Sequence, residues 1–144
     1  MSVIYEPTRA ERWLATKLGT DPILSGLIAG RIYAGVAPQG VASPFVTFTM
    51  LAAPSAVMGN GTTIVWQKLV YLVKAVTKGN SASSLQTIAD RINAVLHATR
   101  GATSDAAIDY CVRLRPFRME TIENNERWQH LGCEVEMAVR ASDV

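Results

Sequence analysis

Residues Thr62–Thr77, TTIVWQKLVYLVKAVT, decide the fold because they read as a single strand of unusual length. An ordinary strand has about 5–6 residues, so this one is predicted to project beyond its own core as part of a hairpin. Both of its faces are mostly apolar, although Lys68 and Lys74 interrupt one of them, so both need cover. One face carries Ile64, Trp66, Val70, Leu72 and Val76, and the other carries Val65, Leu69, Tyr71, Val73 and Ala75.

The segment before this strand predicts its hairpin partner. Phe45–Leu51 alternates as a strand, and Ala52–Gly61 is rich in small and turn-forming residues. Asn60-Gly61 favours a tight turn because both residues tolerate positive φ. Gly59-Asn60-Gly61 is not a phosphate loop, since it precedes a strand and lacks the lysine and hydroxyl residue of that motif.

Two main helices are predicted. Ser81–Ala98 carries apolar residues at helical spacing, and Thr8–Leu18 begins with the capping-box pair Thr8 and Glu11. Asp21-Pro22 opens a further short helical segment that ends at Gly30.

The remaining segments predict more strands. Arg31–Tyr33, Tyr110–Arg115 and Cys133–Arg140 read as strands, and Glu120–Gln129 reads as a polar connector. This order favours one α+β domain over residues 1–144, with a mixed, mainly antiparallel sheet. We expect the two main helices to pack on one face of that sheet, with one long hairpin strand projecting from it.

The composition argues for burial between subunits. Apolar residues make up 49% of the 144 residues and charged residues only 18%, whereas a soluble domain typically carries about 25%. The net charge of +2 is too small to indicate nucleic-acid binding by itself. No apolar run reaches the length of a membrane span, and the N-terminus lacks the pattern of a secretion signal, so we expect synthesis in the cytoplasm.

No catalytic or metal site is predicted. The only histidines, His97 and His130, read as a helix-end residue and a strand residue, and no GxSxG motif is present. Cys111 and Cys133 lack CxxC spacing, and the odd separation of His130 and Cys133 sends them to opposite strand faces. We therefore expect no enzyme activity, no cofactor and no metal.

One basic cluster invites a functional hypothesis. Arg113 and Arg115 are expected to share a strand face, with Arg118 nearby. They could meet DNA phosphates, but cross-strand pairing with the acidic Glu134 and Glu136 is the favoured interpretation. The sequence thus predicts a charge cluster that lies either between strands or along the lumen of an assembly. It leaves contact with DNA open.

Four sequence stretches carry a resemblance to a known family. In order they are RIYAGVAPQGVASPFVTF, LVYLVKAVTKG, CVRLRPFRMET and LGCEVEMAV, within Gly30–Val139. They resemble the tail terminator, or tail completion, proteins of long-tailed phages and gene-transfer particles. The most specific piece is the Tyr-Ala-Gly-x-x-Pro-Gln-Gly loop that precedes the Pro-Phe-Val strand.

The resemblance implies a non-catalytic virion protein at the head-proximal end of the tail. Such proteins form a hexameric ring that caps the tail-tube protein, stops tube growth and offers its other face to the head-closure or neck protein. DNA passes through the lumen without sequence-specific binding. A closed ring needs a heterologous interface, and we expect Ile64, Trp66, Tyr71 and Val73 to lie at a subunit or tube interface. Another head–tail joining subunit, such as a head-closure or connector protein, and a DNA-binding accessory module are the alternatives.

Overall fold

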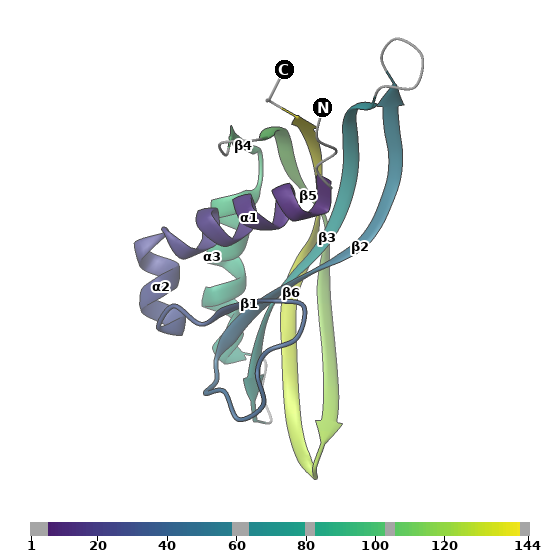
Figure 1. Ribbon diagram of the computed structural model, residues 1–144. Coiled ribbons are helices and arrows are strands. Elements are labelled where there is room, and N and C mark those ends of the chain that lie inside the picture. Colours follow the sequence, from purple (N-terminus) through teal and green to yellow (C-terminus); the bar gives the residue numbers. More distant parts are fainter. Residues whose placement is uncertain (1–5, 59–63, 80–82, 103–105, 142–144) are drawn as a thin grey trace.

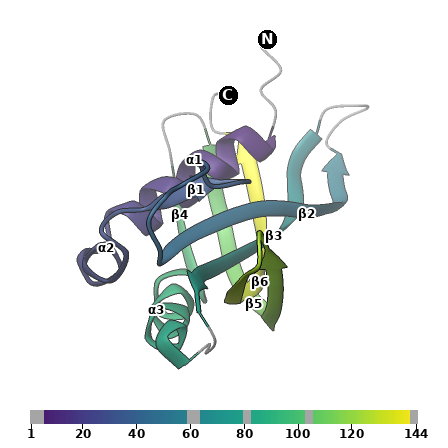
Figure 2. The ribbon, with the colours of Figure 1, turned by 90° about the horizontal axis from the view of Figure 1, so that it is seen from below.

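The computed structural model describes residues 6–58, 64–79, 83–102 and 106–141. Six strands form one mixed sheet in the order β1-β2-β3-β6-β5-β4, in which only β1 and β2 run parallel. The helices lie together on one side of this sheet (Figures 1 and 2). The α+β prediction is therefore confirmed. The elements are α1 (Glu6–Gly19), α2 (Pro22–Ile28), β1 (Ile32–Ala34), β2 (Phe45–Met58), β3 (Ile64–Lys78), η1 (Ser83–Leu85), α3 (Gln86–Leu96), β4 (Thr99–Ala102), β5 (Ala106–Glu123) and β6 (Glu126–Ala141).

Two long hairpins project from opposite ends of the sheet (Figure 1). The β2–β3 hairpin contains the long strand that the sequence predicts. The β5–β6 hairpin replaces the predicted connector Glu120–Gln129, and that prediction is wrong. Its strands meet at Asn124-Asn125, whose φ values of +52° and +62° are those of a tight hairpin turn, and asparagine tolerates them well.

Strand β2 is longer than predicted because irregular pairing carries it past its small residues. It continues from Leu51 to Met58, with register shifts between Met50 and Ala52 and between Ala52 and Ser55. Bulges of this kind accommodate a proline such as Pro54 within a strand. The short strand β4 was not predicted at all.

The helices differ from the prediction mainly at their starts. Thr8 lies inside α1, so the predicted capping box does not begin that helix. Asp21 does cap α2, because its Oδ2 accepts a hydrogen bond of 2.9 Å from the Leu24 N–H. The same carboxylate accepts a 2.8 Å hydrogen bond from Arg91 Nε, which ties α2 to α3.

The core lies between the helices and one face of the sheet. On β3, Leu69, Tyr71, Val73 and Ala75 are fully buried there. Burial of each large aliphatic side chain contributes roughly 1.5–3 kcal/mol. Gly101 lets α1 approach β4 closely, since a Cβ at this position would lie 2.5 Å from Trp13 Nε1. The helices contribute Trp13, Leu14, Leu18, Leu24, Ile28, Ile88, Ile92 and Leu96.

Candidate assembly surface and groove

None of the described helices lies on the opposite face of the sheet, which we call the bare face (Figure 2). The register aligns Thr47, Lys74 and Gly132 across β2, β3 and β6, so their side-chain positions share this face. Val70 and Lys74 are half-buried, whereas Phe45, Thr47 and Val76 are buried beside a surrounding loop and hairpin. The bare face is thus open along part of its length and enclosed near the β5–β6 hairpin.

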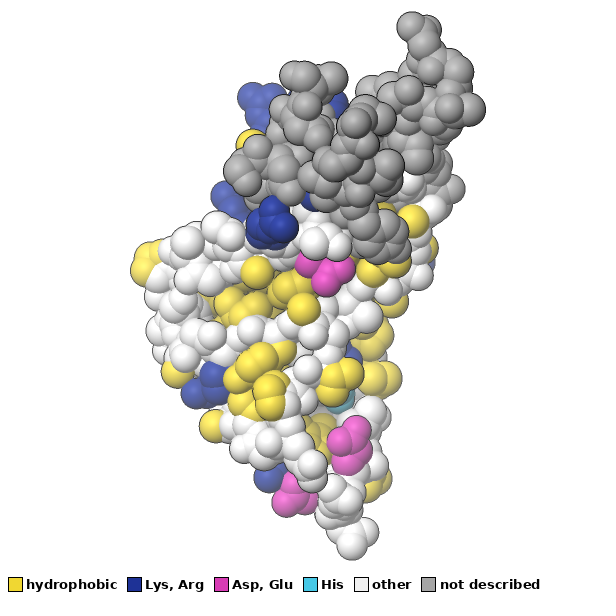
Figure 3. Space-filling model, viewed as in Figure 1, with side chains coloured by type: hydrophobic (Ala, Val, Ile, Leu, Met, Phe, Trp, Pro, Cys, Tyr) yellow, Lys and Arg dark blue, Asp and Glu magenta, His cyan; other side chains and the backbone are white. Residues whose placement is uncertain are grey.

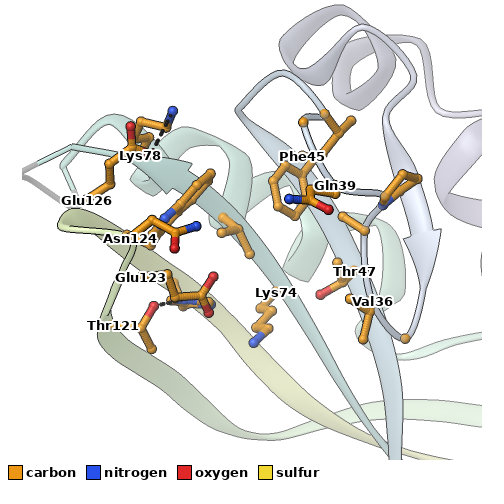
Figure 4. Close-up of a pocket in the computed structure, with 18 residues that line it drawn as sticks. Val36, Gln39, Phe45, Thr47, Lys74, Lys78, Thr121, Glu123, Asn124 and Glu126 are labelled. Atoms are coloured by element: carbon orange, nitrogen blue, oxygen red, sulfur yellow. Dashed lines mark hydrogen bonds and ion pairs between the residues drawn. The ribbon is translucent and has the colours of Figure 1, made fainter.

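A groove of about 510 Å³ lies at this enclosed end (Figure 4). The loop 35–41 forms one wall, and the end of the β5–β6 hairpin forms the other. This loop contains the Gly-x-x-Pro-Gln-Gly part of the motif singled out in the sequence. The floor is Phe45, Thr47, Lys74 and Val76, and the hairpin wall is Thr121, Glu123, Asn124, Glu126, Trp128 and His130.

Aromatic rings line the groove and its edge. The Phe45 ring lies 6.1 Å from the Tyr33 ring in an edge arrangement and 6.4 Å from the Trp128 ring, between centroids. Lys78 Nζ lies 5.3 Å from the Trp128 centroid and 2.9 Å from Glu126 Oε2. The Lys78 charge therefore already has a carboxylate and a ring as partners.

Three polar side chains of the groove, unlike Lys78, have a polar atom without an ionic or hydrogen-bond partner in the described part of the chain. Burial lowers the pKa of Lys74, an effect that the charge of Glu123 partly opposes. His130 Nε2 lies 3.0 Å from Thr121 Oγ1, and burial together with the Lys74 charge lowers the pKa of His130 to about 4. Its Nδ1 and the Thr47 Oγ1 are both buried without a hydrogen-bond partner in the described part of the chain. Polar atoms buried in this way are uncommon in folded proteins and call for an explanation.

The four predicted interface residues have different positions. Tyr71 and Val73 belong to the chain's own core, and Tyr71 Oη donates a 2.9 Å hydrogen bond to Glu11 Oε2 of α1. These two side chains have no surface left for a neighbour, because the chain's own core encloses that face of β3 at both positions. The side chains of Ile64 and Trp66 lie outside the described residues, although their backbone belongs to β3.

The predicted basic cluster is split by irregular pairing. Arg113 is opposite Val135 and Arg115 is opposite Glu134, with a register shift between them, so the two arginines lie on different faces. The expectation that they share a face is wrong, because spacing in the sequence does not reveal a bulge. Arg115 Nε lies 3.0 Å from Glu134 Oε1.

The other members of this cluster have separate surroundings. Glu136 Oε1 accepts a 2.6 Å hydrogen bond from Tyr110 Oη, and burial together with this carboxylate raises the pKa of Tyr110 to about 12. Arg118 is exposed opposite Leu131. The Arg113 N–H donates a 3.0 Å hydrogen bond to Nδ1 of His97, which follows α3.

The described residues offer little chemistry elsewhere. They contain no group of three His, Cys, Asp or Glu side chains that could hold a metal ion. Cys111 and Cys133 are buried free thiols, and burial raises the pKa of Cys111 to about 12, so its thiolate form is disfavoured. No helix in the described ranges has both the length and the apolar character needed to cross a bilayer.

Exposed apolar side chains concentrate on the strands and the groove loop. In the view of Figure 3, hydrophobic side chains reach the surface across the middle of the molecule, and acidic ones are few. Of the large exposed hydrophobic residues in the described ranges, Ile23 alone lies on a helix. The others are Val36, Leu51, Leu114, Met119 and Ile122, exposed by 39% to 89%.

Comparison with known proteins identifies a shared fold. No family model matches the chain, and no curated protein matches its sequence. A solved structure described as the virion of a native gene transfer agent particle aligns with a TM-score of 0.71 and 14% identity, covering 97% of this chain and 100% of that chain. A second solved structure aligns with a TM-score of 0.54 and 10% identity, covering 92% of this chain and 94% of that one. The first likeness extends over nearly the whole of both chains.

Proposed function

We propose that this chain is a structural subunit of a phage-like virion that forms a ring at the head-proximal end of the tail tube. The ring ends tube polymerisation and joins the tail to the head-closure or neck protein, and DNA passes through its lumen. The observation that carries this proposal is the end-to-end fold likeness to a chain of a gene transfer agent virion. The motif resemblance to tail terminators independently favours the same role.

The two hairpins supply two different contact surfaces for such a ring. A closed ring joins two different patches of each subunit, and β2–β3 and β5–β6 offer different surfaces at opposite ends of the sheet (Figure 1). Leu51 on the first hairpin and Ile122 on the second are 49% and 69% exposed. Each hairpin thus exposes a large apolar side chain that a neighbouring subunit would cover.

The ring interface is proposed to use the β2–β3 hairpin rather than the helices. Ile64 and Trp66 stay in this proposal, since their backbone lies toward the start of β3, far along the hairpin from the core residues Tyr71 and Val73. Leu51 joins them as an exposed apolar residue of β2. Arg115 and Glu134 are proposed to serve as an inter-strand pair, which neutralises that part of the basic cluster.

Microscopy of particles assembled without this chain tests the role. A tail terminator predicts overgrown tails without heads, and supply of the intact chain should restore tails of normal length joined to heads. Normal tails beside unjoined heads would contradict tube termination and indicate another head–tail joining subunit. Finished particles in the absence of the chain would contradict both roles.

Matched substitutions test whether the β2–β3 hairpin forms the ring interface. Leu51→Glu and Trp66→Glu should give folded chains that fail to restore particles, because each places a charge in the proposed interface. Ile23→Glu is the control, since Ile23 is similarly exposed, at 55%, but lies on α2. Full complementation by both hairpin variants would refute the proposed interface.

A further inference from the structure

The groove on the bare face contains polar groups that the chain itself does not satisfy. We infer that it binds an extended segment of a partner protein that presents a carboxylate beside a bulky apolar side chain. The inference rests on the groove alone and does not require a ring. Its failure would leave the proposed function untouched.

The apolar part of the recognition comes from the groove walls. Phe45 and Trp128 form an aromatic floor and wall, and Val36 of the opposite wall is 89% exposed. Figure 4 shows Val36 and Phe45 on the same side of the groove, with the hairpin residues opposite. A bulky apolar side chain between the two walls would shield these groups from water.

The polar part comes from two buried atoms without partners. Thr47 is only 4% exposed and lines the floor, yet its hydroxyl has no hydrogen-bond partner in the described ranges. His130 Nδ1 is in the same situation on the hairpin wall. A bound peptide backbone offers donors and acceptors for both atoms, which explains why a strand would keep a buried hydroxyl here.

The preference for a carboxylate comes from Lys74. Its ammonium is half-buried and forms no ion pair with a described residue; Phe117, at 5.8 Å to the ring centroid, and the charge of Glu123 are its neighbours. Lys78, by contrast, is already paired with Glu126. A carboxylate that reaches Lys74 would gain a charge-assisted hydrogen bond in a partly water-excluded site.

The charge balance of the groove favours protein over nucleic acid. Lys74 and Lys78 are offset by Glu123 and Glu126, so the lining has no surplus of positive charge for a phosphate backbone. Within the loop, only Gly35 and Val41 donate a backbone hydrogen bond to another described residue. The N–H groups of Val36, Ala37, Gln39 and Gly40 make no such bond, so this wall of the groove keeps unpaired backbone donors.

Fluorescence anisotropy of labelled peptides with the full chain tests the inference. The probe is a fluorescein-labelled Ser-Gly-Leu-Asp-Gly-Ser peptide, and its comparison is the same peptide with Asn in place of Asp. The Asp peptide should bind roughly fivefold or more tightly, because only it supplies the charge for Lys74. Equal binding of the two peptides, or no binding of either, would overturn the inference.

Variants of the chain locate the binding. Lys74→Met should abolish the preference for Asp, whereas Arg118→Met, which removes a charge from β5 outside the groove, should keep it. Thr47→Val should weaken binding of both peptides while leaving the fold as stable or more so, since it removes an unpartnered hydroxyl. A purely structural Thr47 would not give that combination. Unchanged binding in Lys74→Met, or displacement of the peptide by short duplex DNA at similar concentration, would refute the site.

Discussion

The two faces of β3 have similar apolar sequences but different environments. Leu69, Tyr71 and Val73 on the helix side have no exposed surface at all, whereas Val70 and Lys74 on the bare face are only half-buried. The difference arises because α1 and α3 cover one face, whereas none of the helices that the structure describes covers the other (Figure 2). An apolar strand face therefore indicates that some cover exists, but it does not tell whether the cover comes from the same chain.

The largest expected effect contrasts a core leucine with an exposed one. Leu69→Ala should lower the free energy of unfolding by about 2–5 kcal/mol, because it leaves a cavity in a fully buried site. Leu51→Ala, on the β2–β3 hairpin and 49% exposed, should change the isolated chain by about 0.5 kcal/mol or less. Urea unfolding of both variants measures the contrast. Equal losses would mean that the exposed hairpin surface is not free in the isolated chain.

Gly132 on the bare face is expected not to tolerate even the smallest side chain. A Cβ at Gly132 would lie 2.1 Å from the Val73 carbonyl oxygen and 2.5 Å from Lys74 Cα, so the backbone itself would have to move. Gly132→Ala should therefore cost about 1–3 kcal/mol by urea unfolding.

Gly26→Ala is the matched control for that substitution. Gly26 lies in α2, and a Cβ there would meet nothing within 4 Å. This variant should gain about 0.5–1 kcal/mol, because alanine favours the helix. A Gly132→Ala variant as stable as the parent would show that β3 and β6 approach less closely than described.

The helix layer that covers the core should depend on Asp21. Asp21→Ala removes the α2 cap and should cost about 0.5–2 kcal/mol, whereas Asp21→Asn keeps a capping oxygen and loses the charge facing Arg91. Arg91 and the α2 backbone lower the pKa of Asp21 from 3.8 to about 2. The stability that this charge adds is present above about pH 4 and is lost as the pH falls toward 2.

Unfolding of the parent and of Asp21→Asn at several pH values measures that effect. The difference between them should be constant above about pH 4 and shrink below it. A difference that does not depend on pH would contradict the ion pair with Arg91.

The smallest expected effect concerns His130 in the groove. Its pKa is lowered from 6.5 to about 4 by burial and by the Lys74 charge, so the folded chain holds it neutral. The unfolded chain takes up a proton first, and the contribution of His130 is therefore lost as the pH falls from about 6.5 to 4. Proton NMR titration of the His130 ring should show this low pKa, and Lys74→Met should raise it. Titration near 6.5 would contradict the buried position.

The sequence predicted the fold class from the order of its helical and strand segments, and the long hairpin strand from the extended, mostly apolar run Thr62–Thr77. It also predicted the neighbouring strands Tyr110–Arg115 and Cys133–Arg140, which lie within β5 and β6. It missed their continuation to the hairpin end, because Glu120–Gln129 is polar and alternates little. The Asn124-Asn125 pair is the sequence feature that could have indicated a tight turn there, because asparagine tolerates positive φ. The groove could not be predicted, because it joins loop 35–41 to a hairpin about ninety residues later in the chain through tertiary contact alone.

The central claim is that copies of this chain assemble into a closed ring. Native mass spectrometry of the purified chain over a range of concentrations tests it most directly. The account predicts a closed species of about six times the 15.6 kDa chain mass, which Leu51→Glu converts to monomer and Ile23→Glu leaves intact. A chain that stays at 15.6 kDa at every concentration, or an assembly indifferent to Leu51→Glu and Trp66→Glu, would contradict it.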